Sequence, residues 1–180
     1  MTAKSHRSHR ESSKPSARQA TEIAVVIETP RAERNKYKYD KATGRLKLSK
    51  VMPEGMVFPF DFGFIPGTKS PDGDPLDVLL LHDEPTFPGC QIDCRLVGVF
   101  KACEFSDGKE SRNDRILAVA SASIQFAHVH GLSDLEPALV RQLEEFFVNY
   151  KKARDIRFEI TARQSAKAAY ALFEAHRNSR

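Results

Sequence analysis

The order of the segments along the chain constrains the fold most: most strand-like segments lie between Ile23 and Ile124, and the helix-like segments come late. The strand-like segments alternate apolar and polar residues or form short apolar runs, and Gly, Pro and Asp separate them. They are Ile23–Glu28, Lys36–Tyr39, Arg45–Ser49, Val57–Ile65, Asp77–Leu81, Ile92–Ala102, Arg115–Ile124 and Ile156–Ile160.

Two helices are expected. Ser133 and Glu136 have the spacing of a capping box, which predicts a helix running to about Tyr150. Apolar residues recur along it at helical spacing, and the second helix is expected over Ala162–His176. Many strands followed by late helices predict an α+β protein that is mainly β: a barrel or curled antiparallel sheet with two flanking α-helices.

The most informative segment is acidic. Asp72, Asp74 and Asp77 lie within six residues, Gly73 permits a tight turn, and Pro75 stiffens it. Carboxylates that converge repel one another and require cations, and oxygen ligands favour Mg²⁺ or Mn²⁺ over zinc. A plain turn is the alternative, but three acids directly ahead of an apolar strand favour a metal site.

Known loop motifs of other classes are absent. A calcium EF-hand loop requires Gly at its sixth position, where this chain has Asp77. No GxxxxGK phosphate loop occurs either. A carboxylate-bound Mg²⁺ site suits phosphoryl chemistry, which also requires cationic side chains for the substrate's charge. The pattern alone does not choose among the candidates Lys36, Lys50, Lys69, Lys151, Lys152 and Arg115.

The charge is unevenly distributed. The chain of 180 residues has a formal net charge of +4, and residues 1–21 alone hold five bases and one acid. We therefore expect residues 1–21 to be a disordered basic tail and residues 22–180 to be one domain of balanced charge. The balanced domain gives no case for nucleic-acid binding, and no apolar run approaches the ~20 residues of a membrane span.

The three cysteines, Cys90, Cys94 and Cys103, cannot all form disulfides with one another. Their spacing matches no compact zinc pattern. A reduced chain in the cytoplasm is the simplest interpretation, with Cys94 in the core of a strand and Cys90 in a turn.

The acidic segment, Asp72-Gly73-Asp74-Pro75-Leu76-Asp77-Val78, resembles the signature of the soluble type I inorganic pyrophosphatases, which is short but specific. The resemblance extends in order and spacing over about residues 22–175. It includes Val25–Pro30, Asn35-Lys36-Tyr37, Tyr39-Asp40-Lys41, Gly63–Thr68, and Phe146-Phe147 through Tyr150-Lys151.

The resemblance implies an OB-like five-stranded β-barrel with extra strands, and Mg²⁺-dependent hydrolysis of pyrophosphate to two phosphates. Several Mg²⁺ ions are implied, with Mn²⁺ as the alternative. By this resemblance Asp72 and Asp77 are direct metal ligands, and Asp74 takes the proton of the attacking water. Glu28 orders metal-bound waters, and three residues bind phosphate: Lys36, Tyr150 and Lys151.

The chain departs from the family pattern in its phosphate-binding and hydroxyl-bearing residues. Lys38 stands where the family usually has Glu, and Lys50 where it usually has Arg, which keeps the charge but loses the bidentate fork. Phe58 and Phe62 stand where it usually has tyrosine, so two hydroxyl donors are missing.

The second metal-ligand stretch also differs. Glu104 replaces an Asp as the expected metal ligand, and Arg115 replaces a Lys as a substrate-binding cation. Asn113 falls where a second Asp is usual, after a spacer longer than the family's. Asp114 and Asp107 are the two alternatives for recovering that ligand.

Two other functions remain open at this point. Phe58 and Phe62 would give a larger, more apolar pocket, which favours a paralogue that hydrolyses an organic diphosphate. A non-catalytic barrel that binds a partner through its tail is the other alternative, and the intact Asp72, Asp74 and Asp77 set argues against it. The resemblance also suggests a homo-oligomer, with a hexamer as one form.

Overall fold

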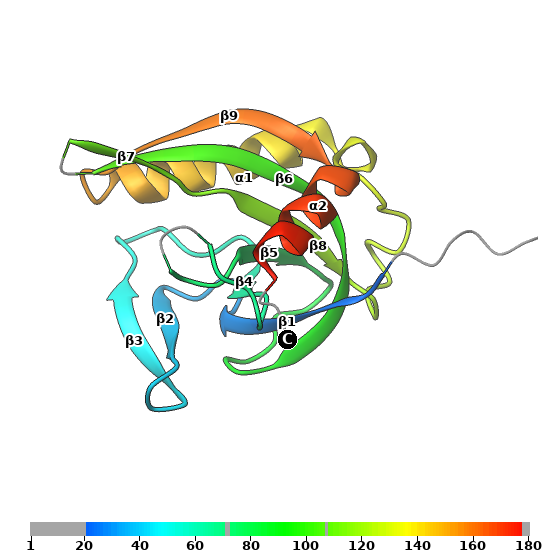
Figure 1. The fold of residues 1–180 in the computed structure, drawn as a ribbon, viewed down its shortest axis with the longest axis horizontal. Coiled ribbons are helices and arrows are strands. Elements are labelled where there is room, and N and C mark those ends of the chain that lie inside the picture. The colour runs from blue at the N-terminus through cyan, green and yellow to red at the C-terminus, as the bar shows by residue number, and fades with distance from the viewer. Residues whose placement is uncertain (1–20, 71–72, 107, 178–180) are drawn as a thin grey trace, which may run out of the picture.

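The computed structural model describes residues 21–70, 73–106 and 108–177, and Figure 1 shows their arrangement. The helical elements are η1 (Leu132–Asp134), α1 (Pro137–Lys152) and α2 (Ala166–His176). The strands in these residues are β1 (Ile23–Thr29), β2 (Asn35–Asp40), β3 (Arg45–Val51), β4 (Asp61–Phe64), β5 (Asp77–Leu81), β6 (Gln91–Ser106), β7 (Lys109–Arg112), β8 (Arg115–Ala120) and β9 (Arg157–Ser165).

Five strands close into a ring. They pair in the order β1-β4-β5-β8-β6, and a further pairing of β1 with β6 closes the circle. The pairing of β5 with β8 is parallel, and the other four are antiparallel. This closed ring with two helices beside it confirms the expected mainly β, OB-like barrel.

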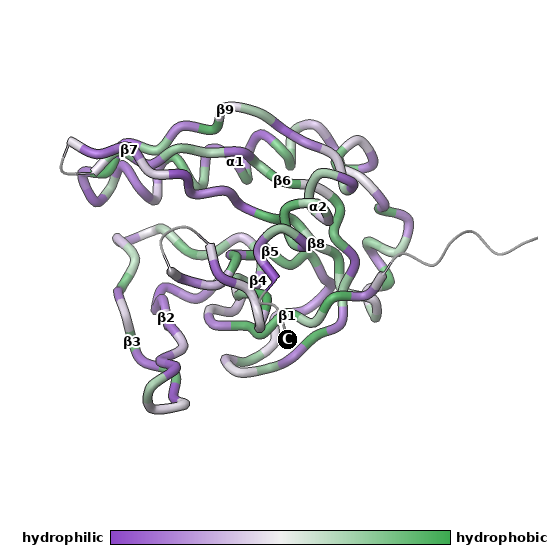
Figure 2. Tube along the Cα trace, in the orientation of Figure 1, coloured by the Kyte–Doolittle hydropathy of each residue, from purple (hydrophilic) through white to green (hydrophobic). Residues whose placement is uncertain are grey.

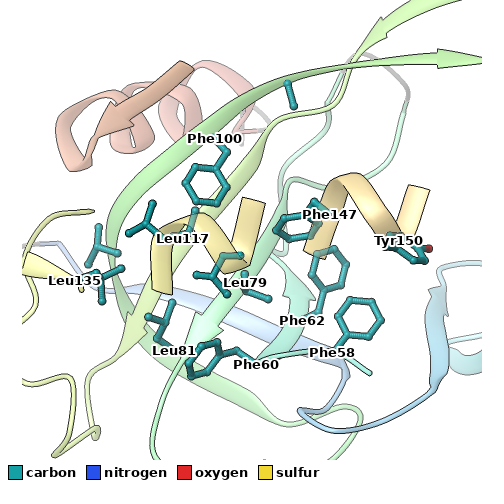
Figure 3. Packing of buried hydrophobic residues seen from close by; sticks show 14 of the residues in the cluster. Phe58, Phe60, Phe62, Leu79, Leu81, Phe100, Leu117, Leu135, Phe147 and Tyr150 are labelled. Atoms are coloured by element: carbon teal, nitrogen blue, oxygen red, sulfur yellow. The ribbon is translucent and has the colours of Figure 1, made fainter. Parts of the chain in front are cut away.

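The alternation of side chains along β5 explains the two hydrophobic clusters. Leu79 and Leu81 pack in one cluster with Phe147 of α1, whereas Val78 and Leu80 pack in the other with Phe173 of α2. Both faces of β5 are therefore buried, which accounts for its continuous apolar run. Figure 2 shows the hydrophobic colour concentrated around β5 and β8, and Figure 3 shows the first cluster.

The helix start differs from the prediction. Ser133 lies in η1, and α1 begins at Pro137 with Glu136 as its N-cap and no side-chain cap bond. Proline suits the first position of a helix, because its missing N–H has no partner there and its φ is already helical. The expected capping box of Ser133 and Glu136 is therefore wrong, and α1 extends two residues past Tyr150.

Other boundaries also shift. The strand expected over Arg115–Ile124 ends at Ala120, and that expected over Val57–Ile65 is confined to Asp61–Phe64. Residues 162–165, expected in the second helix, belong to β9, since they pair with β6. The segment taken as a long spacer after Glu104 completes β6 and forms β7, a pair that the sequence did not predict.

Two extensions reach beyond the ring (Figure 1). β6 is 16 residues long and continues past the ring to pair with β7 and β9. β2 and β3 form a separate antiparallel hairpin, whose turn holds Gly44 at a positive φ of 65°. Among the described residues no helix is long and apolar enough to cross a membrane.

Candidate active site

A cavity of about 640 Å³ opens between the β2–β3 hairpin, the acidic loop that leads into β5 (residues 73–77) and the part of β6 that continues beyond the ring. It gathers almost every residue that the sequence singled out. Glu28, Lys36, Lys50, Asp74, Asp77, Glu104, Arg115, Tyr150 and Lys151 all line it. Asp72 lies outside the described residues, so its predicted role as a metal ligand stays a prediction.

The parallel pairing of β5 with β8 brings Asp77 beside Arg115. Each is the first residue of its strand, and the register pairs the next two residues, Val78 and Ile116. Arg115 Nη1 donates to Asp77 Oδ2 at 2.5 Å. The Arg115 side chain is buried, and its guanidinium carbon lies 5.6 Å from the ring centroids of Phe147 and Phe158. The aromatic core thus holds a cation at the edge of the acidic loop.

Asp74 is presented by a tight turn of the acidic loop. The N–H of Ser70 donates to the carbonyl of Asp74 at 2.7 Å, and Gly73 has a positive φ of 88°. The Asp74 carboxylate accepts a hydrogen bond from Lys38 Nζ at 2.7 Å. This hydrogen bond raises the pKa of Lys38, so the ammonium form of Lys38 is favoured. The turn fixes the loop, and the β2 strand supplies the cation.

Glu28 is almost fully buried at the end of β1. Its Oε1 accepts from the backbone N–H of Tyr39 at 2.6 Å, which ties β1 to the hairpin. Burial raises the pKa of this carboxyl, because its charged form is separated from water. A cation that enters the cavity would therefore stabilise the charged form of Glu28.

Glu104 is held from two sides. Its Oε2 accepts from Lys151 Nζ at 2.5 Å and from the side-chain amide of Asn113. Burial raises the pKa of Glu104, but the pairing with Lys151 and the amide bond outweigh burial and hold it below its ordinary value. For Lys151 burial is the larger effect, and its pKa is lowered. Asn113 is therefore a donor to Glu104, where a metal ligand would be an acceptor.

Asp114 does not recover the missing ligand position. One oxygen accepts from the N–H of Ala102 at 3.0 Å, and the other accepts from Lys101 and Arg112. Its side chain is 7% exposed, so these partners enclose it. Asp107, the second alternative, lies outside the described residues.

Lys36 enters the cavity from an aromatic wall. Its Nζ lies 4.5 Å from the centroid of the Phe62 ring and within 6 Å of those of Phe58 and Tyr150. Burial lowers the pKa of this lysine. Phe58 and Phe62 are each 1% exposed, and their ring centroids lie 5.3 Å apart. Figure 3 shows the two rings next to each other in the first cluster.

Neither phenylalanine lines the cavity or the smaller one of about 510 Å³ beside it. The expected enlargement of the pocket by Phe58 and Phe62 is therefore wrong. They fill the core and support Lys36, so the observation that favoured an organic diphosphate is lost.

Some cavity residues were missed by the sequence analysis. Lys101 and Arg112 hold Asp114, and Arg154 donates to the Tyr150 hydroxyl at 3.4 Å. Lys101 interrupts an apolar strand, and Arg154 follows Tyr150 at the four-residue spacing of a helical contact, so both left a signal. Two cysteines lie where the sequence predicted: Cys94 is buried in β6, and the N–H of Cys90 closes a turn by donating to the carbonyl of Phe87.

The donor chemistry of the cavity suits a hard divalent cation. Among the described residues that line it, the acidic side chains offer carboxylate oxygens, and there is no cysteine to compete with them. Among residues 21–70, 73–106 and 108–177, no three His, Cys, Asp or Glu side chains converge closely enough to hold a metal. Instead Asp74, Asp77 and Glu104 each contact a lysine or arginine of the protein, which supplies the cation that such carboxylates require.

Comparison with known proteins points to one family. The family model "Inorganic pyrophosphatase" matches residues 25–179. An inorganic pyrophosphatase of Synechocystis is 36% identical over 160 residues, which cover 89% of this chain and 92% of the relative. One from Nostoc is 40% identical over 129 residues, covering 72% of this chain and 74% of the relative.

The fold agrees as well. The crystal structure of inorganic pyrophosphatase from Thermus thermophilus superimposes with a TM-score of 0.80 at 30% sequence identity. The match covers 91% of this chain and 94% of that one.

Proposed function

The chain belongs to the inorganic pyrophosphatase family and hydrolyses pyrophosphate to two phosphates, and we propose that it does so in the cavity around Asp74 and Asp77. The observation that carries this location is the convergence of distant segments. Carboxylates from β1, the acidic loop and β6 meet cations from β2, β8 and α1 in one cavity. A metal-assisted hydrolase of a phosphate anhydride requires both kinds of group.

The metal is proposed to be Mg²⁺, with Mn²⁺ as the alternative. The residues that would hold it are Asp72, Asp77 and Glu104, with Glu28 ordering the waters around it. When bound, such an ion supplies an activated water and neutralises charge on the phosphoryl oxygens. Carboxylate ligands with room for water match the preference of both ions.

Asp74 is proposed to accept the proton of the attacking water at its carboxylate. The water oxygen forms a bond to one phosphorus, and the bond from that phosphorus to the bridging oxygen breaks. The bridging oxygen leaves as part of the second phosphate. The hydrogen bond from Lys38 and the turn around Gly73 fix the orientation of the Asp74 carboxylate for this step.

The substrate is proposed to be held by Lys36, Lys50, Arg115, Tyr150 and Lys151. Arg115 Nη1 and Lys151 Nζ already contact carboxylates in the cavity, so phosphate oxygens would compete for the same donors. Lys36 is half-buried against aromatic rings, which limits its hydration and strengthens its attraction to an anion. Charge that develops on the leaving phosphate would meet these fixed cations.

Three further features are proposals. Residues 22–180 are proposed to form the catalytic domain, and residues 1–21 to be dispensable for catalysis. The protein is proposed to be a homo-oligomer, with a hexamer as one form, and to act in the cytoplasm.

The test is phosphate release from pyrophosphate by the purified chain, with Mg²⁺ titrated from zero. Asp77→Asn keeps the size of the side chain and is expected to lower turnover by about 100-fold or more. The matched control is Asp93→Asn, at an exposed position of β6 outside the cavity. Loss of activity in both variants would contradict the proposed location, and no metal-dependent release from the wild type would contradict the function.

A further inference from the structure

Lys38 places a positive charge beside the acidic loop, next to the Asp74 carboxylate. It lies on β2, outside the barrel ring, and its Nζ is 2.7 Å from Asp74 Oδ2. Both side chains are about half exposed, at 53% and 52%. An ion pair that water reaches so freely adds little to stability. The pair therefore matters for the charge it brings to the loop.

The same arrangement is repeated around the cavity. Asp77 contacts Arg115, Glu104 contacts Lys151, and Asp114 contacts Lys101 and Arg112. Among the described residues that line the cavity, eight are Lys or Arg and five are Asp or Glu. The described lining thus has a surplus of three positive charges before any metal binds.

A surplus of positive charge has opposite effects on the two kinds of ligand. Each fixed ammonium near a carboxylate reduces the attraction of that carboxylate for a divalent cation. The same charge attracts a multiply charged anion. Lys38 acts on the acidic loop at contact distance, because its Nζ lies 2.7 Å from Asp74 Oδ2.

We propose that Lys38 replaces a divalent ion beside Asp74, so that this chain binds one metal ion fewer than its carboxylates would otherwise hold, and binds diphosphate anions without metal. The proposal rests on the proposed function of the cavity and deepens it. Lys38 contacts Asp74 and is about half exposed, whereas Arg115 and Lys151, which contact Asp77 and Glu104, are buried.

The first test counts bound metal in the absence of substrate. Mn²⁺ is titrated into the full chain by isothermal calorimetry, and free Mn²⁺ is followed by electron paramagnetic resonance. We expect Lys38→Glu to bind one more Mn²⁺ per chain than the wild type. Lys38→Met, which removes the charge without adding an acid, is expected to bind Mn²⁺ about tenfold more tightly than the wild type.

The second test measures anion binding without metal. Imidodiphosphate, a diphosphate analogue that resists hydrolysis, is titrated in the presence of a chelator. The wild type is expected to bind it, and Lys38→Glu to bind it at least tenfold more weakly. Lys167→Glu is the matched control, because it makes the same charge change at an exposed position near the start of α2, outside the cavity.

Equal Mn²⁺ counts in the wild type and Lys38→Glu, with no tighter binding by Lys38→Met, would overturn the proposal. Metal-free binding that falls equally in Lys38→Glu and Lys167→Glu would also overturn it. Hydrolysis of pyrophosphate by the wild type with Mg²⁺ is measured on the same samples. Normal hydrolysis with unchanged Mn²⁺ counts rejects the role of Lys38 alone, whereas absent hydrolysis rejects the proposed function and leaves the metal count to decide the role of Lys38.

Discussion

Lys36 and Lys50 stand directly opposite each other in the β2–β3 hairpin. Like charges at facing positions of a strand pair are destabilising. Both lysines line the cavity, and burial lowers the pKa of each. The hairpin therefore carries a repulsion that a bound anion would relieve, which is the arrangement expected of a substrate site.

Lys36→Met is expected to stabilise the protein at pH 7 by about 1 kcal/mol, or about 2–4 °C in Tm, because the buried ammonium is disfavoured. Loss of the contact between Lys36 and Phe62 offsets part of the gain. The lowered pKa means that the folded protein releases this proton first, so wild-type stability rises toward pH 10.5 and the gain shrinks. Thermal unfolding of the variant and the wild type at pH 7 and pH 10 measures this difference in stability.

The same variant is expected to bind imidodiphosphate at least tenfold more weakly, since a hydrogen bond to a charged group is lost. Lys47→Met is the control on the same hairpin, because Lys47 lies outside the larger cavity and pairs with Asp40. Unchanged binding by Lys36→Met would contradict the assignment of Lys36 to the substrate.

Glu28→Gln is expected to raise Tm at pH 7 by about 2–4 °C in the metal-free protein. The glutamine oxygen still accepts from the N–H of Tyr39, and the cost of a buried charge is removed. The raised pKa of Glu28 gives the sign: its contribution is favourable below its ordinary value of 4.5 and is lost as pH rises through the raised pKa. The gain should therefore disappear at pH 4, and an equal gain at both pH values would show a packing effect.

The fold was largely predictable from the sequence, because most strands are local apolar or alternating runs. β5 is an apolar run that matches its predicted bounds, Asp77–Leu81. The start of α1 was not predictable from Ser133, because the capping pattern there belongs to a short 3₁₀ turn ahead of Pro137. β7 has no apolar pattern, and its four exposed residues form a strand only because β6 offers them a partner.

The candidate site was predictable in part. The acidic loop is one continuous segment, so its carboxylates were visible together in the sequence. The cations come from distant segments, and only strand register decides which ones reach the loop: Asp77 meets Arg115 through the pairing of β5 with β8. Asp114 stands next to Arg115 in the chain, yet its partners on β6 and β7 hold it away from the acidic loop.

Deletion of residues 1–20 is expected to leave the rate of phosphate release within about twofold of the full chain, because every described residue of the cavity lies after Glu22. The deletion retains Thr21, whose carbonyl accepts from the Tyr170 hydroxyl at 2.8 Å. Turnover and Tm of the shortened chain are compared with those of the full chain. A large loss of turnover with unchanged Tm would assign a functional role to the deleted residues and contradict the predicted domain boundary.

Gly63→Ala is expected to prevent folding, because β1 passes directly over this glycine. A Cβ at Gly63 would lie 2.1 Å from the carbonyl oxygen of Val26 and 2.9 Å from the Cα of Ile27. Both atoms belong to the backbone that pairs with β4, so relief requires the ring to open between β1 and β4. The cost exceeds that of overpacking a side-chain core, about 1–3 kcal/mol.

Gly131→Ala is the matched control, since its Cβ meets nothing closer than 3.6 Å and its backbone is extended. Circular dichroism and urea unfolding should show a native control and an unfolded Gly63→Ala, and a folded Gly63→Ala of normal stability would contradict the close approach of the two strands.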